Sequence, residues 1–180
     1  MSTKRITLTA LYTAIALVLH LFESALPPLF AFAPGAKMGL SNIVSLIAVF
    51  TLGSVDAFVI LVIRCVLGSL FGGNIFSLAY SLPAGAISLG VEIVLIKLLV
   101  PRVSVITVSF TGAVIHNGVQ LLVASIIVKT NLVSLLPLML FASVVAGIAV
   151  GLTAYFTLKY LPERIYLTET KKHNDNDGGI

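Results

Sequence analysis

Three strongly hydrogen-bonding side chains lie in the middle of an apolar stretch at residues 111–128, TGAVIHNGVQLLVASIIV. His116 and Gln120 are four residues apart and therefore share one face of a helix, with Asn117 beside them. Aliphatic side chains lie on the opposite side: Val114, Leu121, Leu122 and Ile126. Such a polar stripe either bonds to a neighbouring helix or lines a cavity. Three different polar groups on one stripe favour a cavity that holds a solute.

Ionisable side chains occur in other apolar stretches, although each costs at least about 2.5 kcal/mol to insert at the bilayer centre. Arg64 and Glu92 are expected at similar depths from the cytoplasmic ends of their helices, roughly 13 and 10 Å at a rise of about 1.5 Å per residue. Two interpretations are open: the two residues form a buried ion pair, or Arg64 contacts an anionic group of a ligand. His20 and Glu23, three residues apart, share a face and could form a local pair.

Two breaks in the apolar pattern are predicted on the outer side of the membrane, the half in which the polar stripe of residues 116–120 is expected. The stretch ALPPLFAFAPGAKMGLSN, residues 25–42, contains three prolines and is predicted to fold over the bundle as a lid, with Lys37 as its only charge. The second break is FGGNIF, residues 71–76, which contains Asn74. The predicted substrate-binding residues are Lys37, Asn42, Arg64, Asn74, His116, Asn117 and Gln120.

The composition requires that these residues be placed by membrane helices. The chain has 180 residues, of which 58% are hydrophobic and 10% charged, whereas soluble domains are about 25% charged. Long apolar runs without period-2 alternation predict an all-α integral membrane bundle of six transmembrane helices. The expected spans are 6–26, 40–54, 55–72, 76–99, 103–128 and 133–158, within a transmembrane domain at 1–165. Residues 166–180 form a polar tail that is expected to be disordered in the cytoplasm.

The distribution of positive charge predicts the orientation. Eight of the eleven Lys and Arg residues flank the predicted spans on the side of both termini, whereas Lys37 and Lys129 lie on the other side. Because Lys and Arg are retained in the cytoplasm, both termini are expected there, in a multi-pass protein of the cell membrane. The same residues account for the basic charge without a nucleic-acid partner.

Small residues spaced four apart predict close helix contacts. Ala10 and Ala14 form such a pair in the first predicted helix, where packing inside the bundle and contact with a partner are equally plausible. In the sixth helix, packing inside the bundle is the expectation for Ala142, Ala146, Gly147 and Gly151.

Several catalytic patterns are absent from the sequence. It contains no G-x-x-x-x-G-K-[ST] phosphate loop and no D-D-x-x-D pattern of the kind that holds magnesium and a diphosphate. A Ser-His-Asp arrangement is not evident either. The chain is therefore predicted to be no enzyme, with no cofactor and no metal site.

Three motifs together resemble a known family: PGAKMGLSN at 34–42, RCVLGSLFGG at 64–73 and GAVIHNGVQ at 112–120. They are similar to the Gx transporter family, often labelled heptaprenyl diphosphate synthase component I, which resembles the S components of energy-coupling factor (ECF) transporters. The resemblance covers roughly residues 5–160. It implies a six-helix S-component fold and a substrate site capped by the loop after the first helix. It also implies that Ala10 and Ala14 dock on a transmembrane coupling protein served by ATPase subunits.

The predicted function is therefore that of a membrane substrate-binding subunit for uptake of a small molecule, such as a vitamin or cofactor precursor, energised by a partner ATPase module. The alternative is a membrane subunit associated with heptaprenyl diphosphate synthesis or isoprenoid-quinone metabolism, for which the metal-binding carboxylates are missing. A third hypothesis is a membrane scaffold without a ligand.

Overall fold

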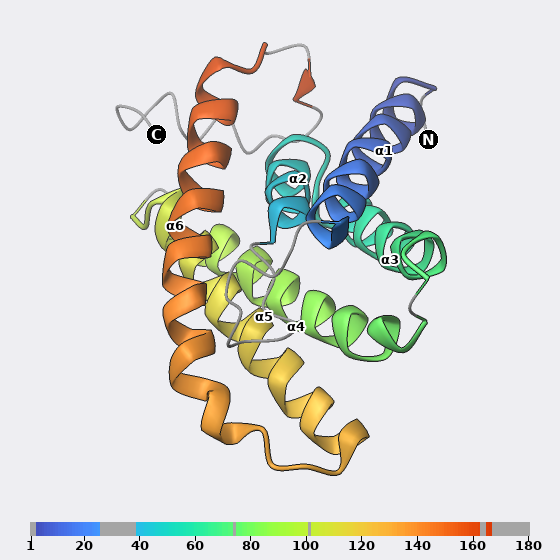
Figure 1. The fold of residues 1–180 in the computed structure, drawn as a ribbon. Helices are drawn as coiled ribbons and strands as arrows, with labels where there is room; N and C mark the ends of the chain where they lie inside the picture. Colours follow the sequence, from blue (N-terminus) through green and yellow to red (C-terminus); the bar gives the residue numbers. More distant parts are fainter. Residues whose placement is uncertain (1–2, 26–38, 74, 101, 163–164, 167–180) are drawn as a thin grey trace.

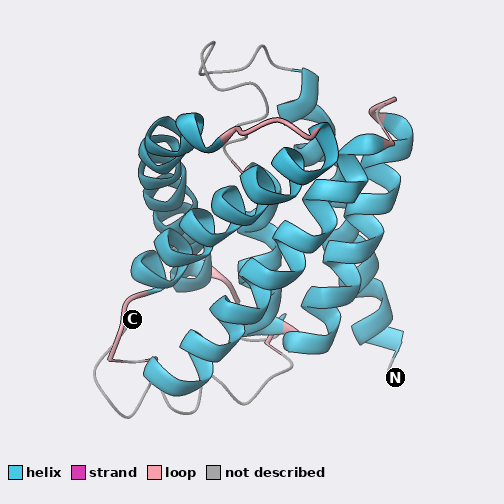
Figure 2. Cartoon of the chain, turned by 90° about the horizontal axis from the view of Figure 1, so that it is seen from below, coloured by secondary structure: helices cyan, strands magenta, loops and turns pink. Residues whose placement is uncertain are grey.

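The computed structural model describes residues 3–25, 39–73, 75–100, 102–162 and 165–166, and nearly all of them are helical (Figure 1). No strand occurs in these ranges (Figure 2), so the prediction of an all-α bundle is confirmed. The helices are α1 Thr3–Ala25, α2 Leu40–Thr51, α3 Ser54–Phe71, α4 Phe76–Leu99, α5 Val105–Val128 and α6 Leu136–Tyr160, with a short 3₁₀ turn at Val133–Leu135.

Five of these helices are long and apolar enough to cross a membrane, so the chain is a multi-pass membrane protein. The exception is α2, whose 12 residues extend for only about 18 Å, less than the roughly 30 Å of the hydrocarbon core. The predicted span at 40–54 is therefore shorter in the structure, because Gly53 with φ 104° separates α2 from α3.

The short α2 lies at the centre of the bundle, between α1 and α3 on one side and α6 on the other (Figure 1). All eight residues from Val44 to Thr51 are buried, as expected for a helix that is apolar all round. Its first residues adjoin Glu23 near the end of α1. The end of the bundle at which α1 ends and α2 begins is called the pocket end below.

The hairpin of α5 and α6 is packed so closely that backbone touches backbone. A Cβ atom added to Gly147 would lie 2.7 Å from Phe110 Cα, and one added to Gly151 would lie 2.8 Å from Ile106 Cα. Since no side chain fits in these gaps, the glycines set the separation of the two helices. The prediction of internal packing by the small residues of the sixth helix is confirmed.

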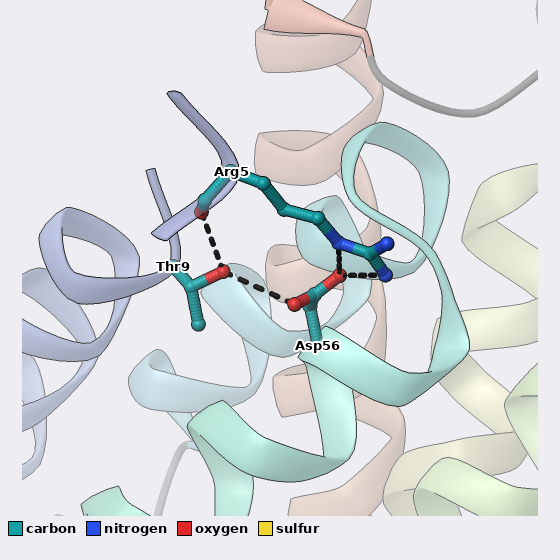
Figure 3. Close-up of polar contacts among 3 residues, drawn as sticks. All are labelled: Arg5, Thr9 and Asp56. Atoms are coloured by element: carbon teal, nitrogen blue, oxygen red, sulfur yellow. Dashed lines mark hydrogen bonds and ion pairs between the residues drawn. The ribbon is translucent and has the colours of Figure 1, made fainter. Parts of the chain in front are cut away.

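At the end opposite to the pocket end, a buried carboxylate joins α1 to α3 (Figure 3). Asp56 is only 1% exposed, and its Oδ2 accepts a hydrogen bond from Arg5 Nε at 2.7 Å and lies 2.5 Å from Arg5 Nη2. Thr9 Oγ1 lies 3.2 Å from Asp56 Oδ1. Asp56 also lies in the first turn of α3, where a negative charge complements the helix dipole.

Candidate solute-binding pocket

A pocket opens at the end of the bundle where α1 ends and α2 begins, and residues of α1, α2, α3, α4 and α5 line it. It encloses about 420 Å³ of empty space when the part open to the outside is included, whereas the inner cavity is about 30 Å³, which is enough for one or two waters. Most of the lining residues have a polar side chain: His20, Glu23, Gly39, Ser41, Asn42, Arg64, Cys65, Ser77, Tyr80, Ser81, His116 and Gln120.

Arg64 is the buried cation of this pocket, with only 3% of its surface exposed. Its Nη1 donates hydrogen bonds to Ser41 Oγ and to Asn42 Oδ1, the latter at 3.3 Å. Its Nε is buried and has no hydrogen-bond partner within the described residues. The guanidinium group is therefore held in position by α2, but one of its donors is unused.

The structure contradicts the interpretation that Arg64 and Glu92 form an ion pair. Arg64 donates to α2 instead, and within the described ranges no carboxylate lies within ion-pair distance of it. Glu92 is buried against α5, where a Cβ atom added to Gly112 would lie 2.6 Å from Glu92 Cδ. The charge of Arg64 still acts on Glu92, but the two side chains make no direct contact, because that of Glu92 is directed to α5 and that of Arg64 to α2.

The beginning of α2 supplies a second positive feature. Gly39 precedes the helix with φ 72°, and its backbone N–H donates to Glu23 Oε1 at 2.6 Å. Gly39 has no side chain that could cap the helix; the Glu23 carboxylate accepts its N–H instead and so lies at the positive end of the helix dipole. A Cβ atom at Gly39 would lie 2.9 Å from Asn42 Nδ2, which adds to the preference of this conformation for glycine.

On α1, His20 and Glu23 both line the pocket, in agreement with their predicted shared face. The His20 ring lies over Gly68 of α3, where an added Cβ atom would come within 2.8 Å of His20 Nε2. Gly68 thus makes the room that lets an imidazole occupy the interface between α1 and α3.

The predicted stripe on α5 is divided between two surroundings. His116 and Gln120 line the pocket, and His116 Nδ1 lies 3.4 Å from Ser88 Oγ of α4. Gln120 is 5% exposed, and its Oε1 is buried without a hydrogen-bond partner in the described structure. The two side chains therefore present hydrogen-bonding groups to the same space as Arg64.

Asn117 is not among the pocket residues, which corrects the expectation that it lines the same cavity. Its Nδ2 donates to Ser143 Oγ of α6 at 2.8 Å, and Ser143 donates to the Met139 carbonyl at 2.7 Å. One residue along a helix rotates the side chain by about 100°, which turns Asn117 from α4 toward α6. Leu121, predicted to face lipid, is also buried, with 4% exposed.

Of the seven predicted substrate-binding residues, the structure brings together Asn42, Arg64, His116 and Gln120. Lys37 and Asn74 lie outside the described residues, as do most of the predicted lid and of the polar tail. Sequence reasoning missed three pocket residues of α4, namely Ser77, Tyr80 and Ser81. Ser77 and Ser81 are four apart with a tyrosine between them, so the same helical spacing could have identified them.

The exposed face of α1 carries the predicted docking pair. Ala10 and Ala14 are both exposed, and the side chains around them are apolar and exposed as well: Leu11, Ile15, Val18 and Phe22. This face is not covered by another helix among the described residues.

No three His, Cys, Asp or Glu side chains in the described ranges are grouped so that they could hold a metal ion. In comparisons with known proteins, the family model described as heptaprenyl diphosphate synthase component I matches residues 12–157. No curated protein and no solved structure matches the chain significantly.

Proposed function

The chain belongs to the heptaprenyl diphosphate synthase component I family, and from this premise we propose that it is a membrane substrate-binding subunit similar to the S components of ECF transporters. It would take up a small molecule such as a vitamin or cofactor precursor. The solute would bind in the pocket formed by α1 to α5, in contact with Asn42, Arg64, His116 and Gln120.

The observation that carries the proposal is a pair of buried polar atoms without partners in one pocket. Arg64 Nε and Gln120 Oε1 are both buried and unbonded within the described structure, and both residues line the pocket. An unsatisfied buried polar atom costs about 1–3 kcal/mol. A solute that bonds to both atoms would recover this free energy, whereas a scaffold without a ligand has no use for them.

The proposal requires that the pocket widen when a solute enters. The inner cavity of about 30 Å³ is much smaller than typical ligand pockets of about 300–1,000 Å³. The open side of the pocket gives a solute access, and small outward shifts of α1 or α4 would enlarge the space.

Energy for uptake would come from partner subunits. The description "component I" implies a further component, and the sequence has no phosphate loop of its own. We propose that the exposed face of α1 around Ala10 and Ala14 contacts a transmembrane coupling protein that carries ATPase subunits. In this arrangement both termini lie in the cytoplasm and the pocket end faces the outside of the cell.

The family description also favours a second candidate, a membrane subunit of heptaprenyl diphosphate synthesis. This role predicts that the purified chain, combined with its soluble partner, extends an allylic diphosphate. The transport role predicts no such turnover.

A thermal-shift measurement tests the transport role. Purified chain in lipid nanodiscs is heated with and without a fractionated extract of cell metabolites. At least one fraction is expected to raise the melting temperature of the wild-type chain, because binding stabilises the folded state by mass action. The same fraction should leave the Gln120→Leu variant unchanged. If no fraction shifts the wild type, or if the variant responds equally, the proposal is wrong.

A further inference from the structure

We propose that the pocket selects an amphoteric solute, with an anionic group placed at Arg64 and a hydrogen-bond-donating group placed at Gln120. A zwitterionic amino acid is the simplest member of this class. The inference rests on the proposed function and adds the chemical class of the solute.

The anionic end follows from the buried guanidinium of Arg64 beside the first turn of α2. Arg64, nine-tenths buried, lies against Ser41 and Asn42 in the first turn of that helix, and its Nε lacks a partner. The bonds to α2 fix the guanidinium plane, so a carboxylate would meet an oriented donor.

The donor end follows from the acceptors on the same lining. Gln120 Oε1 is a buried acceptor without a partner, so it requires a donor from outside the chain. The Glu23 carboxylate on the same lining already accepts the Gly39 N–H at 2.6 Å, so Gln120 Oε1 is the acceptor offered to the solute.

The balance of charge separates an amphoteric solute from a simple anion. The described lining holds one guanidinium, of Arg64, and one carboxylate, of Glu23, beside two imidazoles, which can each be neutral and can both donate and accept. Within the described lining the guanidinium and the carboxylate offset each other, so a solute with several negative charges, such as a diphosphate, would leave charge uncompensated there in surroundings of low dielectric constant.

Matched trios of small compounds provide the test. Each trio contains an amino acid, the acid that lacks its amino group and the amine that lacks its carboxyl group, for example phenylalanine, 3-phenylpropionate and phenethylamine. A second trio is 5-aminopentanoate, pentanoate and pentylamine, and inorganic diphosphate is added as a multiply charged anion. Binding to the full chain in nanodiscs is measured by calorimetry and by thermal shift.

At least one amino acid is expected to bind about tenfold or more tightly than both of its relatives, a difference of about 1.4 kcal/mol. Arg64→Lys should reduce its affinity, and Gln120→Leu should remove the preference for the amino acid over the deaminated acid. Arg5→Gln, which removes a guanidinium at the opposite end of α1, should leave the affinity for the amino acid and the preference over the deaminated acid unchanged. Each variant is first checked for its helical content and melting temperature, and Arg64→Lys keeps the charge so that folding is retained.

The inference is overturned if an acid or an amine binds as tightly as its amino acid, if diphosphate binds most tightly, or if no compound of either trio binds. In each of these cases the proposed function stands as long as a metabolite fraction stabilises the wild-type chain through Gln120. If no fraction does so, the proposed function itself fails.

Discussion

Arg64 is held in place without being neutralised. Its charge is buried among α2, α3 and the pocket, with hydroxyl and amide oxygens as partners in place of a carboxylate. A guanidinium in this state attracts an anionic group more strongly than one that is already paired. At the scale of single residues, the unused bonding capacity of Arg64 and Gln120 distinguishes this pocket from a packed interface.

Gln120→Leu separates binding from stability. Because Gln120 Oε1 has no partner in the described structure, replacing the amide by a leucine removes no bond of the folded chain and is expected to change the free energy of unfolding by less than about 1 kcal/mol. Solute affinity is expected to fall by about tenfold or more. Parallel binding and melting curves of wild type and variant check both expectations. A large loss of stability with unchanged affinity would assign Gln120 to packing.

Asn117→Leu is expected to show the opposite pattern. The change removes the bond from Asn117 Nδ2 to Ser143 Oγ between α5 and α6, which costs about 1–2 kcal/mol, while the pocket lining is unchanged. Its melting temperature should fall and its solute affinity should remain that of the wild type. An Asn117→Leu variant that melts like the wild type but no longer binds would return this residue to the site.

Short connections and small residues determine how the elements are arranged. Gly147 and Gly151 bring α6 against the backbone of α5, and this contact keeps α5 in the orientation in which His116 and Gln120 reach the pocket. Gly68 and Gly112 likewise make room for His20 and Glu92. The helices thus position the polar residues through contacts that only glycine allows.

Gly147→Ala and Gly118→Ala form a matched pair of changes in the α5–α6 hairpin. An added Cβ atom would meet Phe110 Cα at 2.7 Å in the first variant and nothing within 4 Å in the second. Gly147→Ala is expected to destabilise the chain by about 1–3 kcal/mol because two backbones must separate. Gly118→Ala should be neutral or stabilising by up to about 1 kcal/mol. Equal melting temperatures for the two variants would show that the hairpin is packed less closely than described.

Arg5→Gln tests the link between α1 and α3 at the end opposite to the pocket. The change leaves the buried Asp56 carboxylate with Thr9 as its remaining contact among the residues drawn in Figure 3, and the loss in the free energy of unfolding is expected to be about 1–3 kcal/mol. Asp56→Asn should cost a similar amount, and the double variant should cost less than the two changes added together, since both remove one interaction. Additive effects in this cycle would mean that the two residues act independently.

For the whole molecule, the sequence predicted the class of fold and most helix positions because long apolar runs admit one architecture in lipid. It did not predict that α2 falls short of a full span, since Gly53 and the start of α3 end it. It placed Arg64, His116 and Gln120 at one site but misplaced Asn117, and it left open whether Arg64 pairs with Glu92 or contacts a ligand. Those assignments depend on which neighbouring helix a side chain meets, and spacing along one helix does not contain that information.

The proposed partner can be tested on the complete chain. Ala10→Leu and Ala14→Leu add bulk to the exposed face of α1, and Ala149→Leu adds the same bulk to an exposed position on α6. If α1 contacts the coupling protein, the two α1 variants should lose the co-purifying ATPase subunits and the α6 variant should retain them. Retention by all three variants, or loss from all three, would contradict docking through α1.

If the pocket holds a solute through the two unsatisfied atoms of Arg64 and Gln120, that solute should remain on the purified chain, and mass spectrometry of the bound small molecules tests this most directly. Wild type and Asn117→Leu are expected to carry the same compound, whereas Gln120→Leu and Arg64→Lys carry much less of it. A wild-type chain free of bound compound after purification from cells grown in rich medium, or equal amounts on all four proteins, would contradict the claim.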